Sequence, residues 1–470
     1  MSHIQHSNEP TTENFRDRIA TVDESGKRKW IFAYQPKGRF YSIRTVLSLF
    51  YFVIFFGLPF IQIDGRPLFL FNIPNAKFII FGKVFWPQDF FIFGMTMITF
   101  VFFIILFTAA FGRLFCGWAC PQTNFMEMMF RKVEYLILGN AQKQQALQKA
   151  PWTASKTFKI VVKHLVFYLL SFIIANFFLA YIIGIKDLEK IIVEPVSAHM
   201  VGFSAILIFS AVFYAVYAFF REQACTVVCP YGRLQSVLLD KNSMIVAYDY
   251  KRGEPRGNAK KAHEQPLGDC IDCHQCVRVC PTGIDIRNGV QMECVGCTAC
   301  IDACNDVMIK MDKPKGLIRY ASENTIASGE PLHYTTRMKI YTGLCLLVLA
   351  ILSVILFTRK DVDATIMRTP GQLFQERGTD SISNLYNIKV VNKTVDPIEL
   401  SIRLKDGRGK IEIIGKQYIP IEKEGQGSGS FFVVLPNTHI KNRKTELELD
   451  LYEGEKKVGS MKTNFLGPVQ

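Results

Sequence analysis

Cysteine is the residue type whose spacing in this sequence points to chemistry. The 470-residue chain has 13 cysteines, and eight of them form two runs with the spacing C-x₂-C-x₂-C-x₃-C, at residues 270–280 and 294–304. Three thiolates spaced in this way can wrap one [4Fe–4S] cluster within a tight loop, whereas the fourth lies too far along the chain to close the same loop. The fourth cysteine of each run is therefore expected to ligate the other cluster.

This crossover predicts two ligand sets. One [4Fe–4S] cluster is expected on Cys270, Cys273, Cys276 and Cys304, and the other on Cys294, Cys297, Cys300 and Cys280. Zinc is the alternative because C-x₂-C pairs also bind it, but eight cysteines in a doubled pattern favour iron–sulfur clusters. Two neighbouring clusters would accept and pass single electrons.

A second motif, C-x₃-C-P, occurs at residues 116–121 and recurs at residues 225–230. We interpret the recurrence as an internal repeat of helix hairpins. On a continuing helix the two cysteines of each motif share a face, and the proline stops that helix or opens the next one. If the hairpins pack as pseudo-repeats, the four thiols converge. Such a site would take a soft metal, which leaves Cu(I), zinc and an iron–sulfur cluster open.

The remaining soft or titratable side chains have simpler interpretations. Met126, Met128 and Met129 are expected to pack in an apolar interface, although thioether sulfur is also a soft ligand. Cys345 is expected to pack within an apolar helix. His164 and His199 fall near opposite faces of the membrane in the topology described below, so a shared haem is not expected.

The elements that position these residues are five apolar blocks separated by long polar tracts. Hydrophobic residues make up 49% of the chain and charged residues 20%. The blocks lie at residues 43–61, 89–111, 158–183, 196–220 and 340–357. Each is long enough to cross a bilayer, and backbone groups in hydrocarbon must be satisfied internally, so each is predicted to be a helix. This distribution excludes a single soluble core and a disordered chain.

Lys and Arg in the connecting segments predict the orientation. The net charge is +14, and the basic residues concentrate before the first block, between the second and third, and between the fourth and fifth. These segments are therefore expected to face the cytoplasm and its anionic lipid rather than a nucleic acid. Five spans then place the C-terminus outside. Arg359 and Lys360 lie on that outer side, against the rule that basic residues flank membrane helices on the cytoplasmic side. No cleaved signal peptide is expected.

The C-terminal tail has no cysteine and alternates polar with apolar residues. The alternation is clearest at residues 386–390, 398–402 and 446–451, with turns expected at residues 405–407 and 425–429. Short alternating strands at this spacing predict an antiparallel β-sandwich. The lack of cysteine suits an oxidising compartment.

These motifs together resemble the CcoG/FixG/RdxA family of cytochrome c oxidase accessory proteins. The most specific matching segments are residues 113–122, 225–235 and 270–304, and residues 385–394 resemble the start of the family's C-terminal immunoglobulin-like domain. The resemblance implies reduction of Cu(II) to Cu(I) for maturation of a cbb₃-type oxidase. It implies a bacterial inner-membrane protein, with its N-terminus cytoplasmic and its C-terminal domain periplasmic.

The expected fold class is a multi-domain membrane protein with a five-helix bundle, a cytoplasmic ferredoxin-like domain and an outer immunoglobulin-like β-sandwich. The expected domains are a cytoplasmic segment (1–42), four spanning helices with both C-x₃-C-P motifs (43–230), the two-cluster domain (231–339), the fifth helix (340–358) and the β-domain (359–470).

The leading hypothesis is a cupric reductase, a one-electron oxidoreductase that uses two [4Fe–4S] clusters and takes copper as substrate or transient ligand. Its catalytic, metal-binding residues would be Cys116, Cys120, Cys225 and Cys229. An assembly scaffold or redox sensor without turnover, and a quinol-linked membrane ferredoxin, are the alternatives. Expected partners are membrane lipid, an unidentified cytoplasmic electron donor, and a copper transporter or oxidase assembly factors. No nucleic acid is expected, and self-association into a homodimer is left open.

Overall fold

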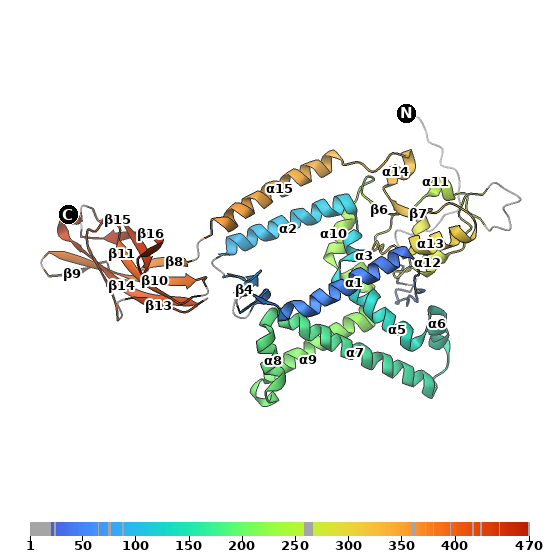
Figure 1. The fold of residues 1–470 in the computed structure, drawn as a ribbon, viewed down its shortest axis with the longest axis horizontal. Coiled ribbons are helices and arrows are strands. Elements are labelled where there is room, and N and C mark those ends of the chain that lie inside the picture. Colours follow the sequence, from blue (N-terminus) through green and yellow to red (C-terminus); the bar gives the residue numbers. More distant parts are fainter. Residues whose placement is uncertain are drawn as a thin grey trace. The chain divides into compact units, whose positions relative to one another are not determined.

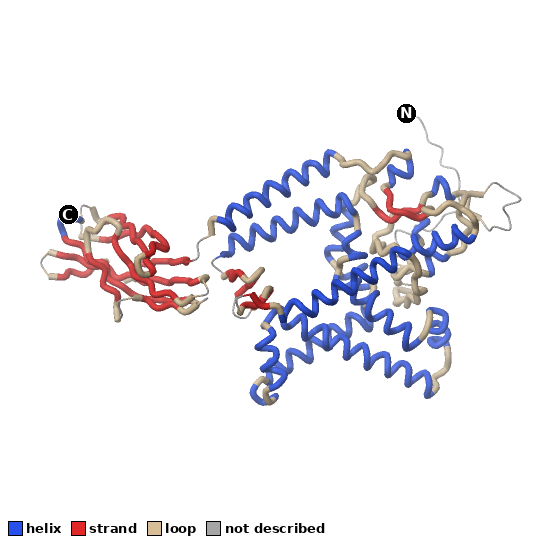
Figure 2. Tube along the Cα trace, in the orientation of Figure 1, coloured by secondary structure: helices blue, strands red, loops and turns tan. Residues whose placement is uncertain are grey.

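The computed structural model describes residues 20–468 except 23–24, 64, 74–76, 87–88, 258–266, 360–361, 372, 379, 395, 416–417, 424 and 441. Two compact units divide the chain: Met1–Gly82 with Phe93–Leu352, and Lys83–Ile92 with Ser353–Gln470. Helices dominate the first unit and strands the second (Figures 1 and 2). Arg16 and Arg18, which belong to the basic segment before the first apolar block, and Lys360 lie outside the described residues.

All five apolar blocks form helices. They are α1 (Arg39–Gly57, extended by the 3₁₀ turn Leu58–Phe60), α2 (Phe90–Phe111), α7 (Ala154–Ile183), α9 (Met200–Ala215, extended by the π-helix Val216–Phe220) and α15 (Thr336–Phe357). Three lie within the first unit, whereas α2 and α15 each cross its boundary by a few residues. Within the described residues these are the five helices long and apolar enough to cross a membrane. The five predicted helices are thereby confirmed, with ends that differ by a few residues.

The connections carry short elements that the sequence analysis did not anticipate. After α1 come β1 (Gln62–Ile63), β2 (Arg66–Pro67), β3 (Phe69–Asn72), β4 (Lys77–Ile80) and β5 (Lys83–Phe85). Antiparallel pairing joins β1 to β2 and β3 to β4. After α7 lies α8 (Ile185–Val193), which reaches α9 through a 3₁₀ turn.

The predicted cytoplasmic stretch folds around its cysteines. Its antiparallel strands are β6 (Ile245–Tyr248) and β7 (Ile318–Ala321), and its helices are α11 (Tyr250–Gly253), α12 (Gln275–Arg278), the 3₁₀ turn Ile286–Asn288, α13 (Ala299–Lys310) and α14 (Glu323–Ser328). Buried apolar side chains of these elements, such as Val246, Met308 and Ile318, surround the cysteines. The segment before α1 also packs here, because the Tyr34 amide donates to the Arg278 carbonyl at 2.8 Å.

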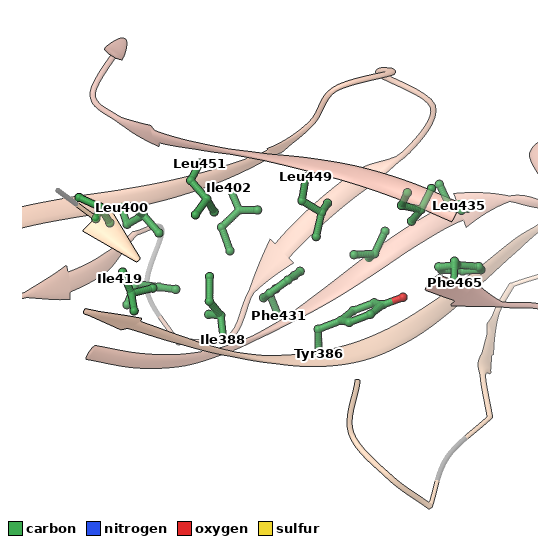
Figure 3. Close-up of a cluster of buried hydrophobic side chains, with 14 of the residues drawn as sticks. Tyr386, Ile388, Leu400, Ile402, Ile419, Phe431, Leu435, Leu449, Leu451 and Phe465 are labelled. Atoms are coloured by element: carbon green, nitrogen blue, oxygen red, sulfur yellow. The ribbon is translucent and has the colours of Figure 1, made fainter. Parts of the chain in front are cut away.

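The second unit is an antiparallel β-sandwich, as its alternating sequence predicts. One sheet has the order β12 (Lys410–Ile413), β14 (Gln426–Pro436), β10 (Ser381–Asn392) and β8 (Val362–Arg368), with β9 (Gln375–Arg377) also on β10. The other has the order β13 (Ile419–Ile421), β11 (Ile398–Leu404), β15 (Lys444–Glu453) and β16 (Lys456–Leu466). Figure 3 shows Tyr386, Ile388 and Phe431 of the first sheet facing Leu400, Ile402, Leu449 and Leu451 of the second.

One turn prediction in this unit is confirmed and the other is wrong. Gly407 takes a left-handed conformation (φ 63°) in a turn after β11. Residues 426–429, however, begin β14. A Cβ atom at Gly427 or Gly429 would come within 2.7 Å of Ile421 or 2.8 Å of Ile419 on β13. These glycines therefore serve close packing between the sheets rather than a turn.

A buried charge cluster in the second unit joins Asp89, just before α2, to Arg359 and Lys393. Asp89 is 7% exposed and accepts from Lys393 at 2.6 Å and from Arg359 at 2.8 Å. The charge of Arg359, which runs against the positive-inside rule, is thus paired with a carboxylate.

Candidate iron–sulfur and thiol site

The structure brings each predicted cluster ligand set together around its own cavity. One cavity is lined by Cys270, Cys273, Cys276 and Cys304, together with His274 and Arg287. The second is lined by Cys280, Cys294, Cys297 and Cys300, and Cys276 also borders it. The fourth cysteine of each run therefore lies with the other run, as the crossover predicts. We call these the first and second ligand sets.

The backbone of both cysteine loops takes a repeated left-handed conformation. Asp272 and His274 have φ values of 52° and 55°, and the matching residues Gly296 and Thr298 have 66° and 62°. Left-handed residues next to right-handed ones turn successive N–H groups toward one concave side, which forms an anion-binding nest of the kind found at iron–sulfur sites. The loops therefore fit a cluster whose thiolate ligands make it anionic.

Burial controls the protonation of these cysteines. It raises the pKa of Cys297 to about 11, and the positive charge of Arg44 is the largest effect opposing it. The pKa of Cys294 is likewise raised by burial, while the backbone N–H of Gly296 lowers it. Such thiols are protonated at neutral pH, so binding of a cluster must displace their protons.

The two C-x₃-C-P motifs share one backbone plan. Cys116 lies in α3 (Leu114–Trp118) and Cys225 in the π-helix Ala224–Val228, each just after a spanning helix. Cys120 and Cys229 are extended residues (ψ 127° and 113°) that cap α4 (Pro121–Asn124) and α10 (Pro230–Leu238). The prediction of a continuing helix through each motif is therefore wrong, because the chain turns at the second cysteine and the proline opens the next helix.

The four thiols of these motifs nevertheless gather in one place. Burial raises the pKa of Cys116 to about 12, and charges on Cys120 and Cys229 would raise it further. The pKa of Cys225 is also about 12, with burial as the main cause and Cys120, Cys116 and Cys229 contributing. Cys116 and Cys225 are therefore within electrostatic range of each other and of both Cys120 and Cys229.

Polar groups with unused donors border this thiol group. The Cys116 Sγ donates to Gln235 Oε1 at 3.1 Å, and Gln235 itself is fully buried. Its Nε2, and the Nε2 of Gln122, have no hydrogen-bond partner within the described residues. Unpaired buried donors are costly unless something accepts from them, which suits thiolates that carry negative charge when they bind a metal.

Two glycines bring the thiol group against the second ligand set. A Cβ atom on Gly117 would lie 2.5 Å from the Gly296 carbonyl oxygen, and a Cβ atom on Gly296 would lie 2.9 Å from the Arg113 carbonyl oxygen. Cys116 and Cys225 also pack against the apolar cluster that contains Cys297. The C-x₃-C-P motifs therefore adjoin the second ligand set directly.

Two arginines stabilise this contact with hydrogen bonds. Arg44 donates from Nε to the Gly117 carbonyl at 3.0 Å and from Nη1 to the Cys297 carbonyl at 2.8 Å. Arg113 donates to the carbonyls of Cys294 at 3.1 Å and Gly232 at 2.8 Å. Neither role is visible in the sequence, because these acceptors are backbone carbonyls far along the chain.

A buried ion network supports the second motif. Arg221, which has a left-handed φ of 50°, donates to Glu134 on α5 (Arg131–Leu138) at 2.8 Å. Glu222 pairs with Arg28 at 3.0 Å. The turn that leads into Cys225 is thus held by charges from α5 and from the segment before α1.

The remaining singled-out residues take no part in this group. Met126 and Met128 are buried in the π-helix Phe125–Phe130, and Cys345 is buried in α15. The ring of His164 on α7 bonds the Tyr214 hydroxyl at 2.8 Å, whereas His199 bonds Glu194. His164 and His199 do not share a partner.

The thiol group is not a preformed site for a single ion. Among the described residues, no three His, Cys, Asp or Glu side chains are gathered closely enough to hold one metal ion. A metal–sulfur bond of about 2.3 Å requires the sulfur atoms of a tetrahedral site to lie within about 4 Å of one another. The same holds for the two ligand sets, so none of these thiol groups is spaced for a single ion.

Three stretches of the chain match known domain families. Residues 93–140 match a family described as "4Fe-4S binding domain", and residues 220–323 match "4Fe-4S dicluster domain". Residues 352–468 match a family described as "IG-like fold at C-terminal of FixG". The first stretch contains Cys116 and Cys120, and the second contains both cysteine runs together with Cys225 and Cys229.

Three curated proteins are similar over long stretches. Nitrogen fixation protein FixG of Rhizobium meliloti is 36% identical over 65% of this chain but only 60% of its own length. Protein RdxA of Cereibacter sphaeroides is 31% identical over 86% of this chain and 89% of its own. Protein RdxB of the same organism is 33% identical over 78% and 80%.

Proposed function

The chain belongs to the family of FixG, RdxA and RdxB, and from that premise we propose that it is a membrane-bound cupric reductase. It carries single electrons through iron–sulfur clusters and reduces Cu(II) to Cu(I) for maturation of a cbb₃-type cytochrome c oxidase. The observation that carries this proposal is the packing of the C-x₃-C-P motifs, through Cys116, Cys225 and Gly117, against the second ligand set.

The chain's own residues would do three things in this reaction. The two ligand sets would hold [4Fe–4S] clusters, which supply one-electron transfer when bound. The glycine contact between residues 117 and 296 keeps the thiols beside the second set. Arg44 and Arg113 fix the relative position of the two loops.

The copper step needs one electron and no proton: Cu(II) gains one electron and leaves as Cu(I). Thiolate sulfur prefers Cu(I), so the thiols favour the product form of the ion. Because the described residues hold no preformed single-ion site, we propose that the thiols contact copper transiently, as substrate. The proposed orientation places this step on the cytoplasmic side. An alkaline phosphatase fusion at the C-terminus would lack activity if that orientation is wrong.

The test compares copper reduction in the anaerobically purified protein and two variants. A Cu(I)-specific chelator reports product when Cu(II) is added to protein that has been reduced with dithionite and then freed of excess dithionite, which would itself reduce Cu(II). The variant with Cys116, Cys120, Cys225 and Cys229 all changed to Ser is expected to reduce Cu(II) far more slowly while it keeps its iron. The control, Cys345→Ser, changes a buried cysteine remote from these motifs and is expected to react at the wild-type rate. A wild-type rate in the fourfold variant would exclude the proposal.

A second candidate has specific support. The family match over residues 93–140 is described as a 4Fe-4S binding domain, although that stretch contains only Cys116 and Cys120. Like the two ligand sets, the four thiols are not spaced for a single ion. A third [4Fe–4S] cluster there would raise the iron content from about 8 to about 12 atoms per chain. The fourfold Cys→Ser variant would then lose about one third of its iron.

A further inference from the structure

Arg44 is a buried cation without a carboxylate partner. The residue is 4% exposed on α1, and its hydrogen bonds go to the carbonyls of Gly117 and Cys297. Its Nη2 has no hydrogen-bond partner, and Arg44 forms no ion pair within the part of the chain that the structure describes. Glu127, which lines a cavity together with Arg44 and Cys297, is paired with Arg131 at 3.0 Å. A full positive charge therefore lies at the second ligand set.

The first ligand set has the opposite arrangement. Arg287 borders its cavity, and this guanidinium is paired with both Asp285, at 2.6 Å, and Asp272. Two carboxylates therefore compensate the charge of this guanidinium, whereas no carboxylate pairs with Arg44 within the described residues. The two ligand sets therefore differ in local charge although their cysteine spacing is the same.

We propose that Arg44 is a positioning residue that sets the direction of electron flow, by making the second ligand set the one that more readily holds the added electron. Reduction adds one negative charge to a cluster, and a nearby uncompensated cation in a buried setting stabilises that charge. Asp272 and Asp285 oppose the same charge at the first set. An electron given to either set would thus settle at the second, which adjoins Cys116 and Cys225.

This inference rests on the proposed iron–sulfur electron transfer but not on copper as the final acceptor. It also assigns the entry point. A one-electron reductant would meet the first ligand set, where His274 is exposed, whereas the matching Thr298 of the second set is 1% exposed. The electron would leave through the second set, which adjoins the C-x₃-C-P motifs.

The experiment is an anaerobic redox titration of the iron-loaded full chain, followed by low-temperature electron paramagnetic resonance. Arg44→Gln removes the charge, and Arg44→Lys keeps the charge but loses the guanidinium that bonds two carbonyls at once. Arg44→Gln is expected to disfavour reduction of the higher-potential couple about tenfold, or ~59 mV for one electron. The lower couple should move much less, and Arg44→Lys should stay near the wild type.

Two further variants make the test independent of the stability of the Arg44 variants. Asp285→Asn removes one carboxylate from Arg287 and is expected to raise the lower couple. Lys310→Gln removes an exposed charge paired with Asp306 and should shift neither couple. Failure of Arg44→Gln to shift the higher couple, an equal shift of both couples, or an equal shift in Arg44→Lys would overturn the inference. Iron-free wild-type protein would instead overturn the proposed function.

Discussion

At the scale of single residues, the contact that joins the two sulfur groups is made by glycine. Gly117 has no room for a side chain, because its Cβ would meet a backbone carbonyl that cannot rotate away. The cysteines themselves could be assigned from the sequence, since ligand spacing is local. The roles of Gly117 and Arg44 could not, because each depends on a contact with a loop that lies far along the chain.

We expect Gly117→Ala to separate the thiols from the second ligand set. The added methyl group must push the loop at Gly296 away, which should cost about 1–3 kcal/mol of stability as overpacking does. Copper reduction should slow because the electron must cross a longer gap. The rate with a Cu(I) chelator and the thermal midpoint in detergent check both effects. The control is Gly343→Ala on α15, where a Cβ meets nothing within 4 Å, and it should alter neither quantity.

At the scale of elements, a buried ion network holds the second C-x₃-C-P motif. Arg221 and Glu134 have side chains only 3% and 4% exposed, and they join the residues before Cys225 to α5. Burial alone would raise the pKa of Glu134, but Arg221, Lys163 and Arg131 hold the pKa below its ordinary value. Hydropathy identified the apolar helices, whereas this network joins polar segments that show no periodic pattern.

We expect Glu134→Gln to destabilise the protein by about 3–5 kcal/mol, because the buried Arg221 loses its hydrogen-bonded carboxylate and keeps only the longer contact with Glu222, at 3.7 Å. A carboxylate whose pKa is lowered by folding stabilises above its ordinary pKa and loses that effect as the pH falls through the lowered value. The difference from the wild type should therefore shrink in acid. Thermal unfolding at neutral and acidic pH measures this. The exposed pair Asp187–Lys190 provides the control, since Asp187→Asn should cost less than about 1 kcal/mol. A similar cost in both variants would contradict this account.

At the scale of the whole molecule, the chain combines a helical membrane unit that carries the cysteines with a separate β-sandwich. Apolar blocks and alternating strands predicted both, because burial in lipid and in a sandwich core leaves distinct periodic patterns. The short strands β1–β5 escaped prediction, since each is too short to show alternation. The predicted turn at residues 425–429 was wrong, because glycine that allows close packing cannot be distinguished in the sequence from glycine in a turn.

The central claim is that the chain holds two iron–sulfur clusters, one of which lies beside the thiol group of the C-x₃-C-P motifs. The most direct test is iron and acid-labile sulfide analysis of anaerobically purified protein, with low-temperature electron paramagnetic resonance after reduction. We predict at least about 8 iron and 8 sulfide per chain, and signals from two interacting reduced [4Fe–4S] clusters. Colourless protein without iron or a resonance signal would contradict the claim.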